Sequence, residues 1–144
     1  MSDALEEIAD RDLLLRRIPD QPAMWTRKGG QVRPSSAAMQ PSETDGGLSV
    51  DVRRLLPNPT IPTSVLGEHP EHGLVEFSAR VPRELDLEVV HDPLPDRCSH
   101  ANIAGFPGDR AAHLRVRRTI AKRSVWVKMP PGALATGLVS TSEE

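Results

Sequence analysis

The chain has 144 residues, and its 18 basic and 20 acidic side chains give a net charge of −2. This length suits one domain with short extensions, and no apolar run approaches the ~18 residues that a membrane-spanning helix needs. The single cysteine, Cys98, excludes an internal disulfide. Because the N-terminus also lacks an apolar signal region, we expect a cytoplasmic protein that does not bind a membrane. The 14 prolines argue against a bundle of long helices.

The N-terminal part of the chain predicts a helix followed by a strand. Residues 1–10 are acidic and place apolar side chains at helical spacing, which is typical of a short accessory helix. Residues 13–18 are apolar and short enough for a buried strand, although a continuation of the helix is also compatible with them. We favour the strand, because Pro19 pushes the residue before it toward an extended conformation.

Residues 19–47 are predicted to be mostly loop, with turns at Gly29-Gly30 and Gly46-Gly47. Apolar and polar residues then alternate over 48–52, which predicts a half-exposed strand. After it we expect a helical turn at 53–56 and a stiff, proline-rich connector over 57–63. Further along, the pattern predicts strands at 73–77, 87–90 and 100–104, and a short helix that starts near Ser78.

Residues 110–123 form the clearest predicted helix, with Asp109 as the N-cap. Its apolar arc is centred on Val116 and Ile120, so one side of the helix is expected to face a core. The opposite arc is basic and is a candidate nucleic-acid surface, formed by Arg110, Arg115, Arg118, Lys122 and Arg123.

A last strand is predicted at 125–127, and residues 129–144 read as a flexible tail. Together these elements predict an α+β fold with one domain over 11–128. We expect a small mixed or antiparallel sheet with one amphipathic helix packed on it.

Three segments in a fixed order resemble a group of small uncharacterised bacterial proteins. They are Leu-Leu-Arg-Arg-Ile-Pro at 14–19, Arg-Pro-Ser-Ser-Ala-Ala at 33–38 leading to 48–50, and His-Asp-Pro-Leu-Pro at 91–95 leading to His-Ala-Asn-Ile-Ala-Gly at 100–105. The resemblance covers most of residues 13–127 and implies no activity. It suggests that these polar segments form one feature.

Serine and histidine residues offer weak candidates for catalysis. The sequence contains no Gly-x-Ser-x-Gly elbow, and Walker and dinucleotide fingerprints are also absent. Ser35, Ser36 or Ser49 can nevertheless be considered as a nucleophile with His91 or His100 as its base. An enzyme of this kind would act on a phosphate-bearing substrate such as RNA or a nucleotide. Its ligand-binding residues would be Arg33, Ser35, Ser36 and Arg117, and its catalytic candidates are His100, His113 and Ser36.

His113 and Arg117 lie one helical turn apart on the apolar side of the predicted helix. A guanidinium in that position needs either water or a partner. The partner is an anionic ligand in a cleft, a carboxylate such as Asp92 or Asp96, or none if the side chain extends to solvent beside a core histidine.

The remaining histidines do not form a known zinc motif, and we expect neither a metal nor a cofactor. His69 and His72 are three residues apart, but Pro70 between them makes a helix unfavourable. Cys98 and His100 are two apart, so that on a strand both would point to one side.

We therefore hypothesise a non-catalytic, cytoplasmic binding or adaptor subunit of a larger bacterial assembly. The stretch 68–96 is acidic and 110–128 is basic, and such complementary surfaces suit a protein partner. The alternatives are the enzyme described above and direct binding of nucleic acid through the basic helix. The sequence alone does not decide whether the protein is an enzyme.

Overall fold

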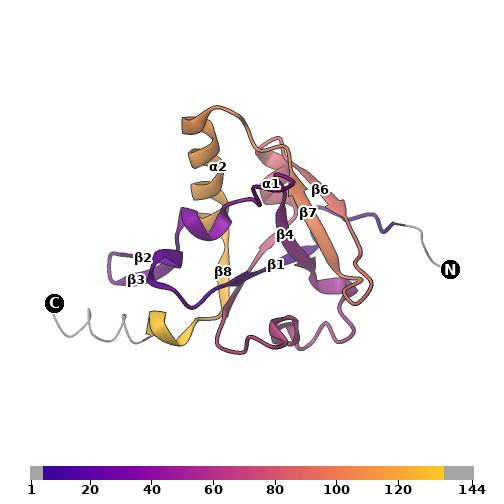
Figure 1. Cartoon of the computed structure of the whole chain (residues 1–144), viewed down its shortest axis with the longest axis horizontal. Helices are drawn as coiled ribbons and strands as arrows, with labels where there is room; N and C mark the ends of the chain where they lie inside the picture. The colour runs from indigo at the N-terminus through magenta and orange to yellow at the C-terminus, as the bar shows by residue number, and fades with distance from the viewer. Residues whose placement is uncertain (1–4, 135–144) are drawn as a thin grey trace.

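A computed structural model describes residues 5–134 and shows a small α+β domain (Figure 1). Six strands form one antiparallel sheet, and two more form a separate hairpin. The predicted fold class is thereby confirmed. The strands are β1 (Leu13–Ile18), β2 (Trp25–Lys28), β3 (Gln31–Pro34), β4 (Leu48–Val52), β5 (Gly73–Ser78), β6 (Glu88–His91), β7 (His100–Ala104) and β8 (Val125–Lys128).

Two α-helices, four short 3₁₀ helices and a single helical turn at 131–134 complete the elements of the described chain. The α-helices are α1 (Arg80–Glu84) and α2 (Arg110–Arg123), and the 3₁₀ helices are η1 (Pro22–Met24), η2 (Ser36–Met39), η3 (Arg53–Leu55) and η4 (Pro62–Leu66). None of the helices within residues 5–134 is long and apolar enough to cross a membrane.

The six-stranded sheet has the order β6-β7-β4-β1-β5-β8. Side chains of a strand alternate between the two faces of a sheet, and β4 shows this alternation clearly. Leu48, Val50 and Val52 are at most 1% exposed and belong to the main core. Ser49 and Asp51 point to the opposite side. We call the side with Leu48 the inner face and the side with Ser49 the outer face.

Helix α2 covers the inner face, where Val116 and Ile120 join the main core. The predicted cap is present, since an oxygen of Asp109 accepts a hydrogen bond of 2.9 Å from the backbone N–H of Ala112. Burying these apolar side chains stabilises the fold by roughly 25 cal/mol for each Å² removed from water. The opposite side of α2 stays exposed, as its basic pattern predicts.

The outer face carries a second and smaller core under the 53–72 segment, which lies across the sheet from α2 (Figure 1). This core consists of Leu15, Leu56, Leu66 and Leu74. It covers only part of the outer face. The polar side chains of β4 and β7 lie beyond its edge.

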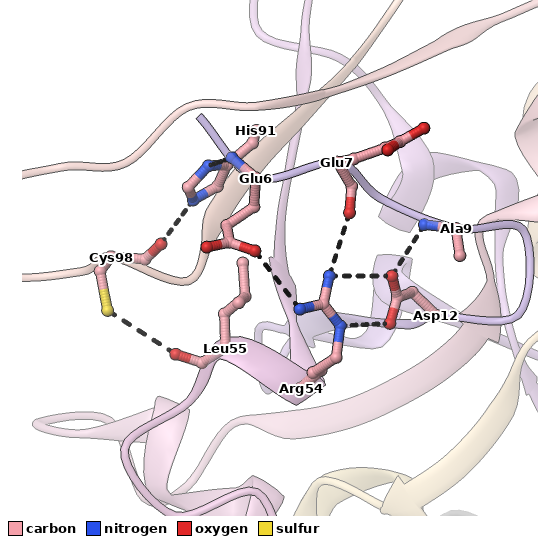
Figure 2. Close-up of polar contacts among 8 residues, drawn as sticks. All are labelled: Glu6, Glu7, Ala9, Asp12, Arg54, Leu55, His91 and Cys98. Carbon is pink, nitrogen blue, oxygen red and sulfur yellow. Dashed lines mark hydrogen bonds and ion pairs between the residues drawn. The ribbon is translucent and has the colours of Figure 1, made fainter. Parts of the chain in front are cut away.

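The predicted helix at 1–10 is not found in its described part, because residues 5–10 contain no helix. Arg54 instead holds this segment along the domain (Figure 2). Its guanidinium donates to both carboxylate oxygens of Asp12, at 2.9 and 3.2 Å, and to the carbonyl of Glu7 at 3.1 Å. These long-range contacts replace the local hydrogen bonds that a helix would make.

His91 forms a second attachment point for the same segment (Figure 2). Its Nε2 donates to the carbonyl of Cys98 at 2.7 Å, and its Nδ1 accepts from the backbone N–H of Glu6 at 2.8 Å. The buried side chain of Ile8 anchors the segment in the main core.

Two loop predictions need correction. Residues 25–34 form the β2–β3 hairpin, in which Gly29 and Gly30 both have positive φ, at 58° and 80°. Two such residues suit the tight turn of a hairpin. The sequence did not predict the two strands, because they are short and lack a strong alternation of apolar and polar residues. The 57–63 segment is also not an extended connector, since turns lead directly into η4 at Pro62.

The predicted tail is packed where it is described. A helical turn spans 131–134, and Ala133 is fully buried. The N–H of Gly132 donates to the carboxylate of Asp20 at 3.0 Å. Residues 135–144 of the predicted tail and residues 1–4 of the predicted N-terminal helix lie outside the described residues.

The Arg54–Asp12 contact predicts a loss of stability in acid. The hydrogen bond from Arg54 lowers the pKa of Asp12 below its ordinary value of 3.8. The contact therefore stabilises the fold above pH 3.8 and is lost as the pH falls through the lowered pKa. We expect Asp12→Asn to reduce the free energy of unfolding at pH 7 by about 1–3 kcal/mol. As the pH falls, the free energy of unfolding of this variant should decrease less than that of the native chain.

Chemical denaturation at several pH values measures this effect. Glu7→Gln is the matched control, because only the backbone of Glu7 contacts Arg54. Equal stability of the two variants at pH 7, with the same decline in acid, would contradict the role of the contact.

Candidate functional site

A polar pocket of about 300 Å³ opens on the outer face, beside the small core. Ligand sites are concave and carry a few convergent polar groups, and this pocket gathers four charged side chains and two imidazoles. Its lining comprises Leu15, Arg16, Arg17, Pro19, Ser49, Asp51, His69, His72 and Arg97.

Ser49 is hydrogen-bonded to His100 from the neighbouring strand, with 2.7 Å between Oγ and Nε2. The Nδ1 of His100 lies 2.8 Å from the backbone carbonyl of Asp92 and 3.4 Å from its carboxylate. A carbonyl oxygen only accepts, so Nδ1 carries the proton of the neutral ring. The lone pair of Nε2 therefore accepts from the Ser49 hydroxyl. A hydroxyl, an imidazole and the backbone carbonyl of Asp92 are thus linked in one chain of hydrogen bonds, in which the imidazole is placed to take the hydroxyl proton.

Strand pairing explains why these residues meet. Asp51 of β4 lies opposite His100 of β7, and Ser49 lies opposite Asn102. Cross-strand partners share one face of a sheet, so that all four point outward. Asn102 also donates to the Asp92 carboxylate at 2.9 Å and fixes its position.

Asp51 is the buried acid of the pocket, with a side chain only 3% exposed. It accepts from Arg97 at 2.6 Å and from the hydroxyl of Ser99 at 2.8 Å. A buried carboxylate without such partners would be costly. The charges of Asp51 and Arg97 therefore neutralise each other, and the pair forms one side of the polar pocket.

Arg17 has no such compensation. It is half-buried, and within residues 5–134 its guanidinium makes no hydrogen bond or ion pair. Burial lowers the pKa of Arg17, the charge of Arg97 lowers it further, and Asp51 opposes this change. The guanidinium is thus a partly desolvated cation without a hydrogen-bonded counter-charge in residues 5–134, since Asp51 is already paired with Arg97.

His72 contributes a second unsatisfied group to the same pocket. Its Nδ1 is buried and has no hydrogen-bond partner in the described part of the chain. Burial lowers the pKa of His72 below its ordinary value of 6.5. The ring is therefore mainly neutral at pH 7 and can donate one hydrogen bond.

Arg16 also lines the pocket, but its guanidinium is hydrogen-bonded to the backbone. It donates to the carbonyls of Ala38 and Ser49, at 3.1 and 2.9 Å. Burial, and then the neighbouring charge of Arg17, lowers the pKa of Arg16 to about 10. The second hydrogen bond fixes the backbone of the serine that contacts His100.

The sequence-predicted site does not form as a single pocket. His113, Arg117 and Ser36 do come together on the inner side of the sheet, where Arg117 donates to His113 Nδ1 at 3.0 Å and to the Ser36 carbonyl at 3.3 Å. His100 points to the outer face, away from α2 and from this cluster. The partner of Arg117 is therefore a histidine and a carbonyl, and not Asp92 or Asp96.

The other predicted ligand-binding residues also lie elsewhere. The hydroxyl of Ser35 donates to the Ala23 carbonyl at 2.6 Å. Arg33 is exposed on the β2–β3 hairpin, where it contacts Gln31. His91 binds the N-terminal segment, and its two ring nitrogens are hydrogen-bonded to the backbone of Glu6 and Cys98. Of the serine and histidine candidates, only Ser49 and His100 are joined.

Arg33 lines a larger groove of about 870 Å³ between the β2–β3 hairpin, the end of α2 and β8. This groove is mainly apolar and reaches Leu134, the last described residue. Its titratable groups are the basic side chains of Arg27, Arg33 and Lys122, with no histidine or carboxylate among them. We therefore place the candidate site in the smaller polar pocket, which combines both.

The predicted nucleic-acid residues are all exposed along α2. Arg123 forms an ion pair with Glu84 at 3.5 Å. The other four basic side chains make no ion pair with residues 5–134.

Comparison with known proteins gives no match to a family model, a curated protein or a solved structure. The function is therefore argued from the geometry of the polar pocket.

The contacts of His100 predict its tautomer. At pH 8 we expect Nδ1 to be protonated and Nε2 to be free, because Asp92 accepts from the first and Ser49 donates to the second. Nitrogen NMR of the imidazole distinguishes the two forms. The opposite tautomer, or a His100 signal that Ser49→Ala leaves unchanged, would contradict the hydrogen-bonded chain.

Proposed function

We propose that the protein is a binding protein for a small anion, with a phosphate-bearing molecule as the favoured ligand. The observation that carries this proposal is the unpaired guanidinium of Arg17 in the polar pocket. A desolvated cation without a partner is unfavourable, and an anion seated beside it relieves the cost.

The charge and size of the pocket support the same ligand class. Three arginines and one aspartate line it, which is a formal excess of two positive charges. A phosphate monoester carries a charge near −2 at neutral pH and several acceptor oxygens. Guanidinium groups match such oxygens through charge-assisted hydrogen bonds. The volume of about 300 Å³ is at the lower end of the range for small-molecule sites.

The decisive variant is Arg17→Gln. A hydrogen bond to a charged group contributes about 1.5–3 kcal/mol, so we expect phosphate to bind at least about tenfold more weakly to this variant. Its stability without ligand should be unchanged or higher, because the variant removes a half-buried charge that makes no hydrogen bond to residues 5–134. Calorimetric titration with inorganic phosphate measures the affinity, and a parallel titration with acetate tests whether the pocket binds a carboxylate instead.

Arg118→Gln is the matched control, since it removes an exposed arginine of α2. Phosphate binding that is absent from the native chain, or that Arg118→Gln weakens as much as Arg17→Gln does, would overturn the proposal.

The Ser49–His100 contact favours a second candidate function, hydrolysis of an ester held in the same pocket. Ser49 Oγ would attack the carbonyl carbon or phosphorus atom while its proton passes to His100 Nε2. The leaving oxygen would then take that proton, and water would release the product by the reverse sequence. Asp92 would hold the ring in the required orientation.

A fluorophosphonate probe tests this candidate directly. We expect covalent labelling of Ser49, detected by mass spectrometry, and at least about a tenfold slower reaction in His100→Ala, since general-base assistance supplies about 10²–10⁴-fold. Ser64→Ala is a matched control, because Ser64 is exposed and remote in sequence from the contact. Failure to label Ser49 rejects hydrolysis and leaves anion binding intact.

A protein partner remains a proposal that rests on the charge pattern. The exposed basic side of α2 is available for an acidic surface or a nucleic acid. Nucleic-acid binding there would weaken steeply with added salt, whereas binding of a small anion by Arg17 would not depend on α2.

A further inference from the structure

The turn at 69–72 presents two imidazoles and a carboxylate together. The N–H of His72 donates to the carbonyl of His69 at 3.0 Å, which closes a four-residue turn. Pro70 occupies the second position, which proline favours in turns. The turn brings His69 and His72 to one side, and their rings stack at 4.7 Å with an angle of 8° between the planes.

Glu71 lies between the two rings. Its Oε2 is 3.5 Å from His69 Nδ1 and 3.6 Å from His72 Nε2. One donor atom from each of the three residues lies within 4.8 Å of the other two. In a tetrahedral site with metal–ligand bonds of about 2.0–2.1 Å, neighbouring donor atoms are about 3.3–3.4 Å apart. Two of the three distances are therefore already close to those of a metal site.

We propose that His69, Glu71 and His72 bind a divalent transition metal, with zinc as the favoured ion. Two imidazole nitrogens and one carboxylate oxygen form a donor set that suits zinc, and three protein ligands leave a fourth position open. Calcium and magnesium prefer sites made of oxygen donors. The inference rests on these three side chains and does not require the proposed anion-binding function.

Two features favour metal binding at this turn. Lys128 donates to the carbonyls of Pro70 and His72 and ties the turn to β8. His69 and Glu71 are exposed, so that a metal can enter and small ring rotations can bring the third distance into range. His69 and His72 also line the polar pocket, which places the open metal position at its wall.

Titration of the EDTA-treated full chain with Co²⁺, and then with Zn²⁺ in competition, tests the proposal without phosphate. We expect one equivalent to bind, with the intense visible absorption of tetrahedral Co²⁺, and Zn²⁺ to displace it. His69→Ala and Glu71→Gln should each weaken binding by at least about tenfold. Both side chains are exposed, and a melting curve verifies that the variants fold.

Two control variants make the result specific. Glu68→Gln removes an exposed carboxylate next to the turn, and Cys98→Ser removes the exposed thiol; both should bind the metal as the native chain does. Absence of stoichiometric binding, or binding that survives His69→Ala and Glu71→Gln, would overturn the site. Loss of phosphate binding in Arg17→Gln has no bearing on either result.

Discussion

The alternation of side chains along β4 and β7 is the constraint on which the rest of the structure depends. Every second residue must face α2, and Leu48, Val50 and Ile103 fill that inner face almost without exposure. The same period forces Ser49, Asp51 and His100 outward. A shift of either strand by one residue would reverse both sets. The apolar core therefore fixes the positions of the polar groups.

The outer face holds several charged groups in fixed positions, where they are partly removed from water. Asp51 is neutralised by Arg97, and the backbone of Ser49 is fixed by Arg16. Among the arginines that line the pocket, Arg17 is the one whose guanidinium makes no hydrogen bond to residues 5–134. Proteins retain such an unfavourable group most readily where a ligand provides the missing charge. This energetic imbalance supports anion binding, and the Ser49–His100 contact adds the possibility of chemistry on the bound molecule.

The sequence predicted the elements that local patterns specify, and it failed where distant contacts decide. Helix α2 and strand β7 were predicted with their observed bounds, because Asp109 caps the helix and glycine and proline delimit the strand. The N-terminal helix failed because Arg54, more than forty residues away, competes for that segment. The site was predicted around Arg117, since helical spacing is visible in sequence whereas the pairing of β4 with β7 is not. Pro70 disfavours a helix between His69 and His72, but the turn that it favours brings both histidines together.

A crystal structure with tungstate, an analogue of phosphate, shows whether Arg17 binds an anion in the polar pocket. The anomalous signal of tungsten locates the anion without ambiguity. We expect an anion in the polar pocket, within hydrogen-bond distance of the Arg17 guanidinium. Tungstate bound only along the exposed arginines of α2, with the pocket empty, would contradict it.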